Sequence, residues 1–266
     1  MKFLSYILLS IIQGFTEPIP VSSSGHLVIF NSILNVESLN DLNFEIFVNF
    51  GSFIAITYFY RNEIISIIKD FFKFIKTKEY KYYSNYKYAI LIIIGTIPAG
   101  IFGLFFKDKI EALTSVKIVG ISLLITALML YSIKDIKGKK QKDDMNFTDA
   151  LVIGLFQAIA LFPGISRSGS TLVGGMKRNL DRETAFKYSF MLYLPISIAT
   201  MILGVKDVIK IGLNNALITY YIISLIVSSL VTYFSIKWFK NIVQKDKLKY
   251  FIYYCLIIGL LVILFL

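Results

Sequence analysis

The sequence predicts an all-α polytopic membrane protein, with six transmembrane helices plus two re-entrant helix pairs in an inverted-topology repeat. Three observations predict this fold class. Hydrophobic residues make up 56% of the 266-residue chain and its mean hydropathy is +0.69, so a soluble fold would leave large apolar patches exposed. Apolar runs long enough to cross a bilayer alternate with short polar segments. Two further apolar runs are too short to cross, and they are similar to one another.

Six apolar runs have the length of a transmembrane helix, about 20 residues. In chain order the predicted spans are 42–60, 88–106, 115–134, 184–204, 217–237 and 249–266. The loops between these spans are too short to form a separate soluble domain. Residues 1–266 are therefore predicted to form a single membrane domain.

Two apolar runs, 3–15 and 149–162, are shorter than a membrane span. Each is followed by a stretch rich in Pro, Ser and Gly and then by another short apolar piece, at 27–34 and 171–176. Runs of this length are typical of re-entrant segments, so each copy predicts a re-entrant helix pair. A cleaved signal peptide is the disfavoured alternative, because Lys2 alone supplies a basic region and no suitable cleavage site follows.

The distribution of basic residues predicts the orientation of the chain. Of 28 Lys and Arg residues, 21 lie in the segments 61–87, 134–142, 177–187 and 237–249, whereas six lie in the alternate loops and at the N-terminus. The positive-inside rule places the four rich segments in the cytoplasm and both termini on the outer face. Because the basic residues form no aromatic-studded patch, nucleic acid is excluded as a partner and membrane lipids are expected instead.

A shift of 144 residues aligns the two short segments. Identical residues then fall on one another: Gln13 and Gln157, Ser22 and Ser166, Ser24 and Ser168, Gly25 and Gly169. Three spans follow each copy, so the two halves, about 1–134 and about 147–266, must have opposite orientations. In such folds broken helices meet near the bilayer midplane, and their free N-termini face anions. The repeat predicts an anion site between the two Ser-rich turns; helix capping and close packing are the alternative roles for these serines.

Ionisable residues within membrane segments are candidates for function. A buried Arg167 needs an anion, and its planar guanidinium suits a phosphate; the alternative is a structural ion pair with Glu17. His26, the only histidine of the sequence, follows the serine cluster directly. Its place predicts acid–base chemistry or activation of a serine, and a packed, hydrogen-bonded histidine is the alternative.

Two polar pairs are spaced four residues apart, which places each pair on one face of a helix. Gln13 and Glu17 form the first pair, and with phosphate oxygens they would make a weak site for a divalent cation. Glu45 and Asn49 form the second pair near the outer end of their span. They are expected either to line the same cavity or to cap a loop.

Two motifs resemble the signatures of a known family. The first is QGFTEPIPVSSSGH at residues 13–26, and the second is PGISRSGST at residues 163–171. Both resemble the signatures of the undecaprenyl-diphosphatase family, also called the bacitracin-resistance protein family, and the surrounding spans fit along the full chain. The resemblance implies a bacterial plasma-membrane hydrolase that converts undecaprenyl diphosphate to undecaprenyl phosphate and inorganic phosphate. It also implies a role in recycling the lipid carrier of peptidoglycan synthesis, and bacitracin resistance.

The residues and the resemblance together define a candidate site. The predicted catalytic residues are Glu17, Ser22, Ser23, His26 and Arg167. The predicted substrate-binding residues are Gln13, Ser24, Gly25, Glu45, Asn49, Ser166, Ser168 and Thr171. The resemblance further implies a divalent cation, Mg²⁺ or Ca²⁺, with Glu17 as its predicted ligand. The sequence has Gln13 where many members have glutamate, so it lacks a second carboxylate there.

Two mechanisms and two function classes stay open at this point. A serine, Ser23 ahead of Ser22, would attack the diphosphate with His26 or Glu17 as base, or an activated water would attack directly. The alternative function is a polyprenyl-phosphate flippase or transporter that uses the same inverted-repeat anion site. A transporter needs access from both sides, whereas a phosphatase needs only the outer side. The sequence also leaves open whether the protein forms a homodimer.

Overall fold

The fold is helical throughout the part of the chain that the structure describes. The computed structural model describes residues 2–34, 42–211, 217–245 and 247–266. These residues form α-helices and two short 3₁₀ helices, η2 (Tyr80–Tyr82) and η3 (Lys142–Asp144), with no β-strand. The predicted all-α class is confirmed. The predicted outer loop at 36–41 lies outside the described residues.

Each apolar run of the sequence forms a helix. The six predicted spans correspond to α3 (Leu42–Phe59), α5 (Tyr83–Ala112), α6 (Val116–Tyr131), α9 (Arg182–Ile211), α10 (Ile218–Gln244) and α11 (Lys249–Phe265). The two short pairs are α1 (Lys2–Thr16) with α2 (Ser23–Leu34), and α7 (Phe147–Ile159) with α8 (Arg167–Lys177). Among the described residues, three helical stretches are long and apolar enough to cross a membrane: Tyr80–Phe106, Arg182–Lys206 and Ile218–Gln244. The full number of crossings stays a prediction.

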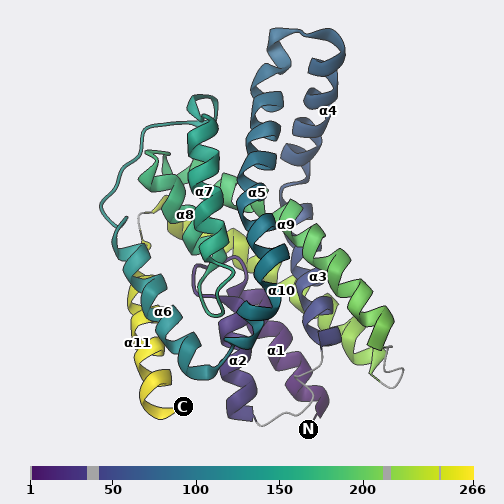
Figure 1. Ribbon diagram of the computed structural model, residues 1–266, viewed down its shortest axis with the longest axis vertical. Coiled ribbons are helices and arrows are strands. Elements are labelled where there is room, and N and C mark those ends of the chain that lie inside the picture. The colour runs from purple at the N-terminus through teal and green to yellow at the C-terminus, as the bar shows by residue number, and fades with distance from the viewer. Residues whose placement is uncertain (1, 35–41, 212–216, 246) are drawn as a thin grey trace.

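One further helix was not predicted. The basic segment 61–87, expected as a loop, contains α4 (Arg61–Thr77). Phe71 and Phe74 of α4 pack against Tyr86 of α5, with ring centroids 5.4 and 4.5 Å from that of Tyr86. The two helices form a hairpin that projects from the body of the molecule (Figure 1). The helix was not predicted because lysines lie between the apolar residues of α4, so the segment was read only as a basic loop.

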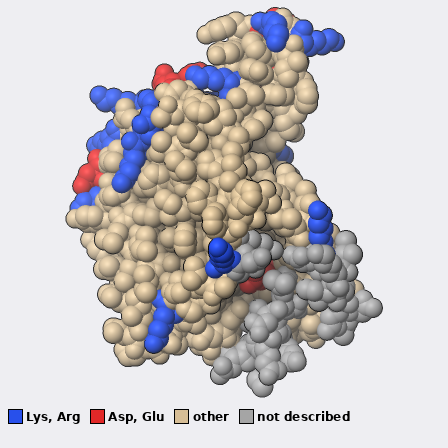
Figure 2. All heavy atoms as spheres, in the orientation of Figure 1, with Lys and Arg blue, Asp and Glu red and all other residues tan. Residues whose placement is uncertain are grey.

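The two short helix pairs meet near the middle of the molecule (Figure 1). From their turns, α1 and α2 extend toward the end that carries both termini, while α7 and α8 extend toward the opposite end. The turns are joined directly, since the Ser168 hydroxyl donates a hydrogen bond of 3.0 Å to the carbonyl oxygen of Ile19. On the face shown in Figure 2, most Lys and Arg side chains lie toward the end opposite the termini.

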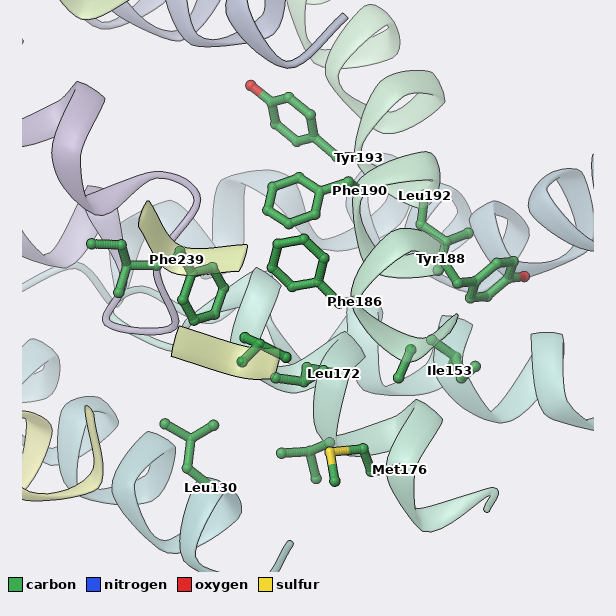
Figure 3. Close-up of a cluster of buried hydrophobic side chains, with 14 of the residues drawn as sticks. Leu130, Ile153, Leu172, Met176, Phe186, Tyr188, Phe190, Leu192, Tyr193 and Phe239 are labelled. Carbon is green, nitrogen blue, oxygen red and sulfur yellow. The ribbon is translucent and has the colours of Figure 1, made fainter. Parts of the chain in front are cut away.

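A row of aromatic side chains along α9 forms part of the core. Phe186, Phe190 and Tyr193 follow one another on one side of this helix (Figure 3), and the ring centroids of the two phenylalanines are 4.9 Å apart. Phe239 of α10 packs against Phe186 with a centroid distance of 5.3 Å. All four side chains are buried. Tyr193 lies next along this row and packs against Phe53 of α3, with ring centroids 6.4 Å apart.

The backbones of α7 and α5 lie almost in contact where the two helices cross. A Cβ atom at Gly154 would lie 2.4 Å from the carbonyl oxygen of Gly95, so neither helix has room for a side chain there. Small residues at such crossings are typical of packed membrane helices. The position of Gln157, which lies three residues further along α7, is therefore set by this contact.

Asp149 anchors the start of α7. Its side chain is completely buried, and it accepts hydrogen bonds from Arg178 Nε at 2.8 Å and from Lys140 Nζ at 3.0 Å. It also forms a capping box with Asn146, in which each side chain accepts a hydrogen bond from the other residue's backbone N–H. The carboxylate is thus the common partner of two basic residues and a helix terminus.

Asp149→Ala is expected to lower the free energy of unfolding by about 3–5 kcal/mol, because it removes one partner from a buried charge network. The measurement is the midpoint of thermal unfolding of the purified protein in detergent. Asp135→Ala is the matched control, since the Asp135 side chain is 86% exposed and its pairing contributes about 1 kcal/mol at most. Equal midpoints for the two variants would contradict the anchoring role.

Candidate active site

Residues from both turns line one cavity of about 350 Å³. The predicted site residues that line it are Glu17, Ser22, Ser23, Ser24, Asn49, Ser166, Arg167 and Ser168. Apolar side chains, including Ile165, Ile196 and Met201, complete the wall. The structure therefore brings together the polar residues of two motifs that lie more than a hundred residues apart in sequence.

The Glu17 carboxylate is the centre of the polar network. Its Oε1 accepts a hydrogen bond of 2.7 Å from Arg167 Nη2, and its Oε2 accepts one of 2.9 Å from Gln13 Nε2. Ser23 Oγ also donates to Oε2. The structure thus contains the Glu17–Arg167 ion pair that was the alternative role for the arginine. Phosphate binding remains compatible with it, because a guanidinium has five N–H donors and this one lines the cavity.

The Tyr193 ring stacks on the flat face of the Arg167 guanidinium. The Arg167 Cζ atom lies 4.0 Å from the centroid of the Tyr193 ring, which is within the range of a cation–π contact. This tyrosine follows Phe186 and Phe190 along α9 (Figure 3). Glu17 holds one edge of the guanidinium, so the side chain is oriented from two directions. Tyr193 was not predicted as a site residue, although it lies 144 residues after Asn49, the offset of the repeat.

The two turns present helix N-termini to the cavity. Ser22 Oγ accepts from the Gly25 N–H at 3.2 Å, and Ser166 Oγ accepts from the Gly169 N–H at 3.1 Å, so both act as N-caps. The next residues, Ser23 and Arg167, are the first of α2 and α8. Helix N-termini carry partial positive charge and attract anions. The cavity therefore combines a guanidinium with two helix ends that favour a phosphate.

The backbone at Ser22 adopts an unusual conformation. Its φ is +67°, in the left-handed region that non-glycine residues rarely occupy, whereas Ser166 has an ordinary φ of −71°. Such strain persists where the surrounding structure holds it, and it clusters at functional sites. The left-handed residue ends the turn directly before Ser23 and so sets the direction in which α2 begins.

Comparison with known proteins extends the two motifs to nearly the whole chain. The sequence profile of the family described as "Bacitracin resistance protein BacA" matches residues 6–261. The chain belongs to this family.

Relatives of this family member carry one consistent name. "Undecaprenyl-diphosphatase 2" of Bacillus thuringiensis is 44% identical over 264 residues, which cover 99% of this chain and 97% of the relative. "Undecaprenyl-diphosphatase" of Oceanobacillus iheyensis is 40% identical over 264 residues, which cover 98% and 96%. A third, "Undecaprenyl-diphosphatase 1" of Halalkalibacterium halodurans, is 40% identical over 261 residues, with 98% and 95% covered. The resemblance drawn from the two motifs is confirmed.

In this BacA-family protein His26 does not line the cavity. Its Nδ1 lies 2.8 Å from the carbonyl oxygen of Ser22, and its Nε2 lies 2.7 Å from the Tyr254 hydroxyl on α11. The ring is buried and stacks on Tyr254. This arrangement matches the packed, hydrogen-bonded alternative, and the catalytic role of His26 stays a prediction. The geometry favours an indirect role, because His26 contacts the carbonyl oxygen of Ser22 and so stabilises the strained turn there.

Four other predicted residues do not line the cavity, and three of them support residues or turns that do. These four are Gln13, Gly25, Thr171 and Glu45. Gln13 Nε2 donates to Asn49 Oδ1 at 2.6 Å as well as to Glu17, and so joins two lining residues. Thr171 Oγ1 donates to the Arg167 carbonyl oxygen at 2.9 Å within the first turn of α8. Gly25 allows close approach of the two turns, since a Cβ there would lie 3.1 Å from Gly164 Cα.

The described residues that line the cavity include one acidic side chain that a divalent cation could bind. Among the described residues there is no group of three or more His, Cys, Asp or Glu side chains that would hold a metal ion. Glu17 is the carboxylate of the cavity lining, and both of its oxygens have partners. An ion on Glu17 would have to displace Arg167 or Ser23. Mg²⁺ commonly binds through one or two carboxylates together with substrate phosphates and water. The requirement for Mg²⁺ or Ca²⁺ stays a prediction.

Proposed function

We propose that this protein is an integral membrane phosphatase that hydrolyses undecaprenyl diphosphate to undecaprenyl phosphate and inorganic phosphate. The names of the relatives support this substrate. The observation that carries the chemistry is the hydrogen bond from Ser23 Oγ to Glu17, in a cavity that Arg167 also lines. The reaction would recycle the lipid carrier of peptidoglycan synthesis in the bacterial plasma membrane and confer bacitracin resistance.

Ser23 is the proposed nucleophile and Glu17 its base. An activated nucleophile lies within hydrogen-bond reach of its base, and Ser23 meets this condition. Ser22 is less suited, because its hydroxyl caps α2. Ser23 Oγ attacks the terminal phosphorus, its proton passes to Glu17, and the bond to the bridging oxygen breaks to release undecaprenyl phosphate. Water then attacks the phosphoserine, Glu17 returns the proton to Ser23 Oγ, and inorganic phosphate leaves.

Arg167 and the two helix N-termini stabilise the charge of the transferred phosphoryl group. Phosphoryl transfer depends mainly on positioning and on electrostatic stabilisation of the equatorial oxygens. The guanidinium is held in place by Glu17 and Tyr193 before substrate binds. Little reorganisation is then needed in the transition state. His26 acts as a positioning residue by holding the carbonyl group of Ser22.

An apolar hollow beside the cavity suits the lipid tail. This hollow, whose volume is about 350 Å³, is lined by four apolar residues of α9 and by one lysine: Ile198, Met201, Ile202, Val205 and Lys206. Met201 lines both the hollow and the polar cavity, so the two spaces adjoin. The diphosphate would occupy the polar cavity while the first prenyl units follow α9 into the membrane. This division matches a substrate with a charged head and an apolar chain.

The proposed membrane arrangement has six crossings, two re-entrant pairs and inverted halves at about 1–134 and 147–266. It is supported by the opposite directions of the two short helix pairs and by the common end of both termini (Figure 1). The Lys and Arg side chains toward the other end (Figure 2) favour a cytoplasmic location for that end. The termini and the opening of the site would then face outward.

Purified protein in detergent separates hydrolysis from transport. A detergent micelle does not separate two compartments, so a flippase would leave undecaprenyl diphosphate chemically unchanged there. A phosphatase would still release inorganic phosphate. We expect phosphate release in proportion to the amount of protein, with undecaprenyl phosphate as the lipid product. No release, together with movement of polyprenyl phosphate between the leaflets of proteoliposomes, would replace the proposal with the transporter alternative.

A further inference from the structure

Gln157 is a buried polar residue whose amide has no partner. The residue is 1% exposed, and neither its Nε2 nor its Oε1 has a hydrogen-bond partner in the described part of the chain. It lies on α7 and lines the same cavity as Glu17 and Arg167. None of the hydrogen bonds of the Glu17 network involves Gln157, so its amide has no role in the arrangement described so far.

The repeat places different residues around this amide than around Gln13. Gln13, at the equivalent position of the first half, donates to Glu17 and Asn49. A shift of 144 residues replaces Glu17 with Leu161 and Asn49 with Tyr193. The Leu161 side chain offers no acceptor, and the Tyr193 ring lies against the guanidinium of Arg167. The second half thus keeps the glutamine without the acceptors that its counterpart uses.

An unpartnered buried amide is unfavourable for the ligand-free protein. Leaving a buried donor unsatisfied costs about 1–3 kcal/mol, and buried polar groups without partners call for an explanation. Gln157 is not needed to space the helices, because the Gly154–Gly95 contact already sets the distance between α7 and α5. A ligand in the cavity would supply the missing acceptor. An oxygen-rich anion is the ligand that the remaining residues of this cavity favour.

We propose that Gln157 is a substrate-binding residue whose side-chain N–H donates to an oxygen of the diphosphate. This inference rests on the proposed function and adds a neutral donor on α7 to the charged donor on α8. Two helices of the second half, α7 through Gln157 and α8 through Arg167, then hold the substrate opposite Ser23 and Glu17 of the first half. The amide makes this bond in the bound state and in the transition state alike.

The variant Gln157→Leu tests the inference, with Gln157→Met as a second variant of similar length. The probe is a polyprenyl diphosphate analogue in which a methylene group replaces the bridging oxygen, so that binding is measured without hydrolysis. We expect its Kd to rise about 10- to 100-fold in both variants, because a hydrogen bond to a charged group is lost. KM for the diphosphate should rise more than kcat falls. The ligand-free variants should unfold at the same temperature as the wild type or higher, because the unsatisfied amide is gone.

Thr96→Val is the matched control. This substitution also removes a polar group from a membrane helix, but the Thr96 hydroxyl is bonded to the Ile92 carbonyl oxygen at 2.8 Å and lies outside the cavity. Its Kd for the analogue should equal that of the wild type. A wild type that releases phosphate, with Gln157 variants that bind the analogue equally well, would overturn the inference alone. A wild type that releases no phosphate would overturn the proposed function instead.

Discussion

Replacing Arg167 with alanine should lower kcat/KM for undecaprenyl diphosphate by about 10³-fold or more. Arginines that stabilise the charge of a phosphoryl transition state contribute about 10³ to 10⁵ to the rate. Arg167 is the cation that lines the cavity, and both Glu17 and Tyr193 orient it. Arg167→Lys should recover only a small part of the activity, because an ammonium group lacks the planar fork and cannot stack on the tyrosine ring in the same way.

The Arg167 variants need a test of folding, because the substitution also leaves Glu17 without its ion-pair partner. The Glu17 side chain is only 9% exposed, so thermal unfolding and elution as a single species should be measured alongside activity. Arg61→Ala is the control, since Arg61 is an exposed arginine that stacks on Tyr58 away from the cavity. A folded Arg167→Ala protein that keeps a tenth of the wild-type activity would contradict the assigned role.

Ser23→Ala and Glu17→Gln should each lower kcat by about 10²- to 10⁴-fold, the range that general-base catalysis contributes. The two residues act as one unit, because the base has no function without the hydroxyl that it deprotonates. The double variant should therefore be little worse than the poorer single variant, as for other nucleophile–base pairs. Steady-state kinetics of the four proteins measures this coupling.

Ser22→Ala distinguishes the nucleophile from its neighbour. Ser22 caps α2 through its bond to the Gly25 N–H, so its removal should cost about 1 kcal/mol of stability and reduce kcat much less than removal of Ser23. Multiplicative losses for Ser23→Ala and Glu17→Gln would show that the two act independently. A greater loss of kcat in Ser22→Ala than in Ser23→Ala would move the attack to Ser22.

The helices and the two turns were predictable because both depend on local sequence. Apolar runs form helices in a membrane protein because the backbone must satisfy its hydrogen bonds internally, and the Ser-rich turns were located by the repeat. Helix α4 was missed because its lysines conceal the apolar face that packs on α5. Charge counting detects where a segment lies relative to the membrane, but not whether it is helical.

The parts of the site that sequence did not predict depend on contacts between distant helices. Spacing placed His26 beside the serines, but packing against Tyr254 of α11 directs its ring away from the cavity. Tyr193 contacts Arg167 because the fold packs α9 against α8. Phosphate binding and an ion pair with Glu17 were the two alternative roles predicted for Arg167. In the structure the guanidinium is bonded to Glu17 and also lines the cavity.

The most direct test of this account is whether Ser23 receives the phosphoryl group. Undecaprenyl diphosphate with a radiolabel in its terminal phosphate would be mixed with a molar excess of purified protein. The reaction would be quenched in acid at successive times. If Ser23 is the nucleophile, undecaprenyl phosphate forms before free phosphate, and the label resides meanwhile on the peptide that contains Ser23. Complete release of labelled phosphate with no label on the protein at any time, or label on a different residue, would contradict this role of Ser23.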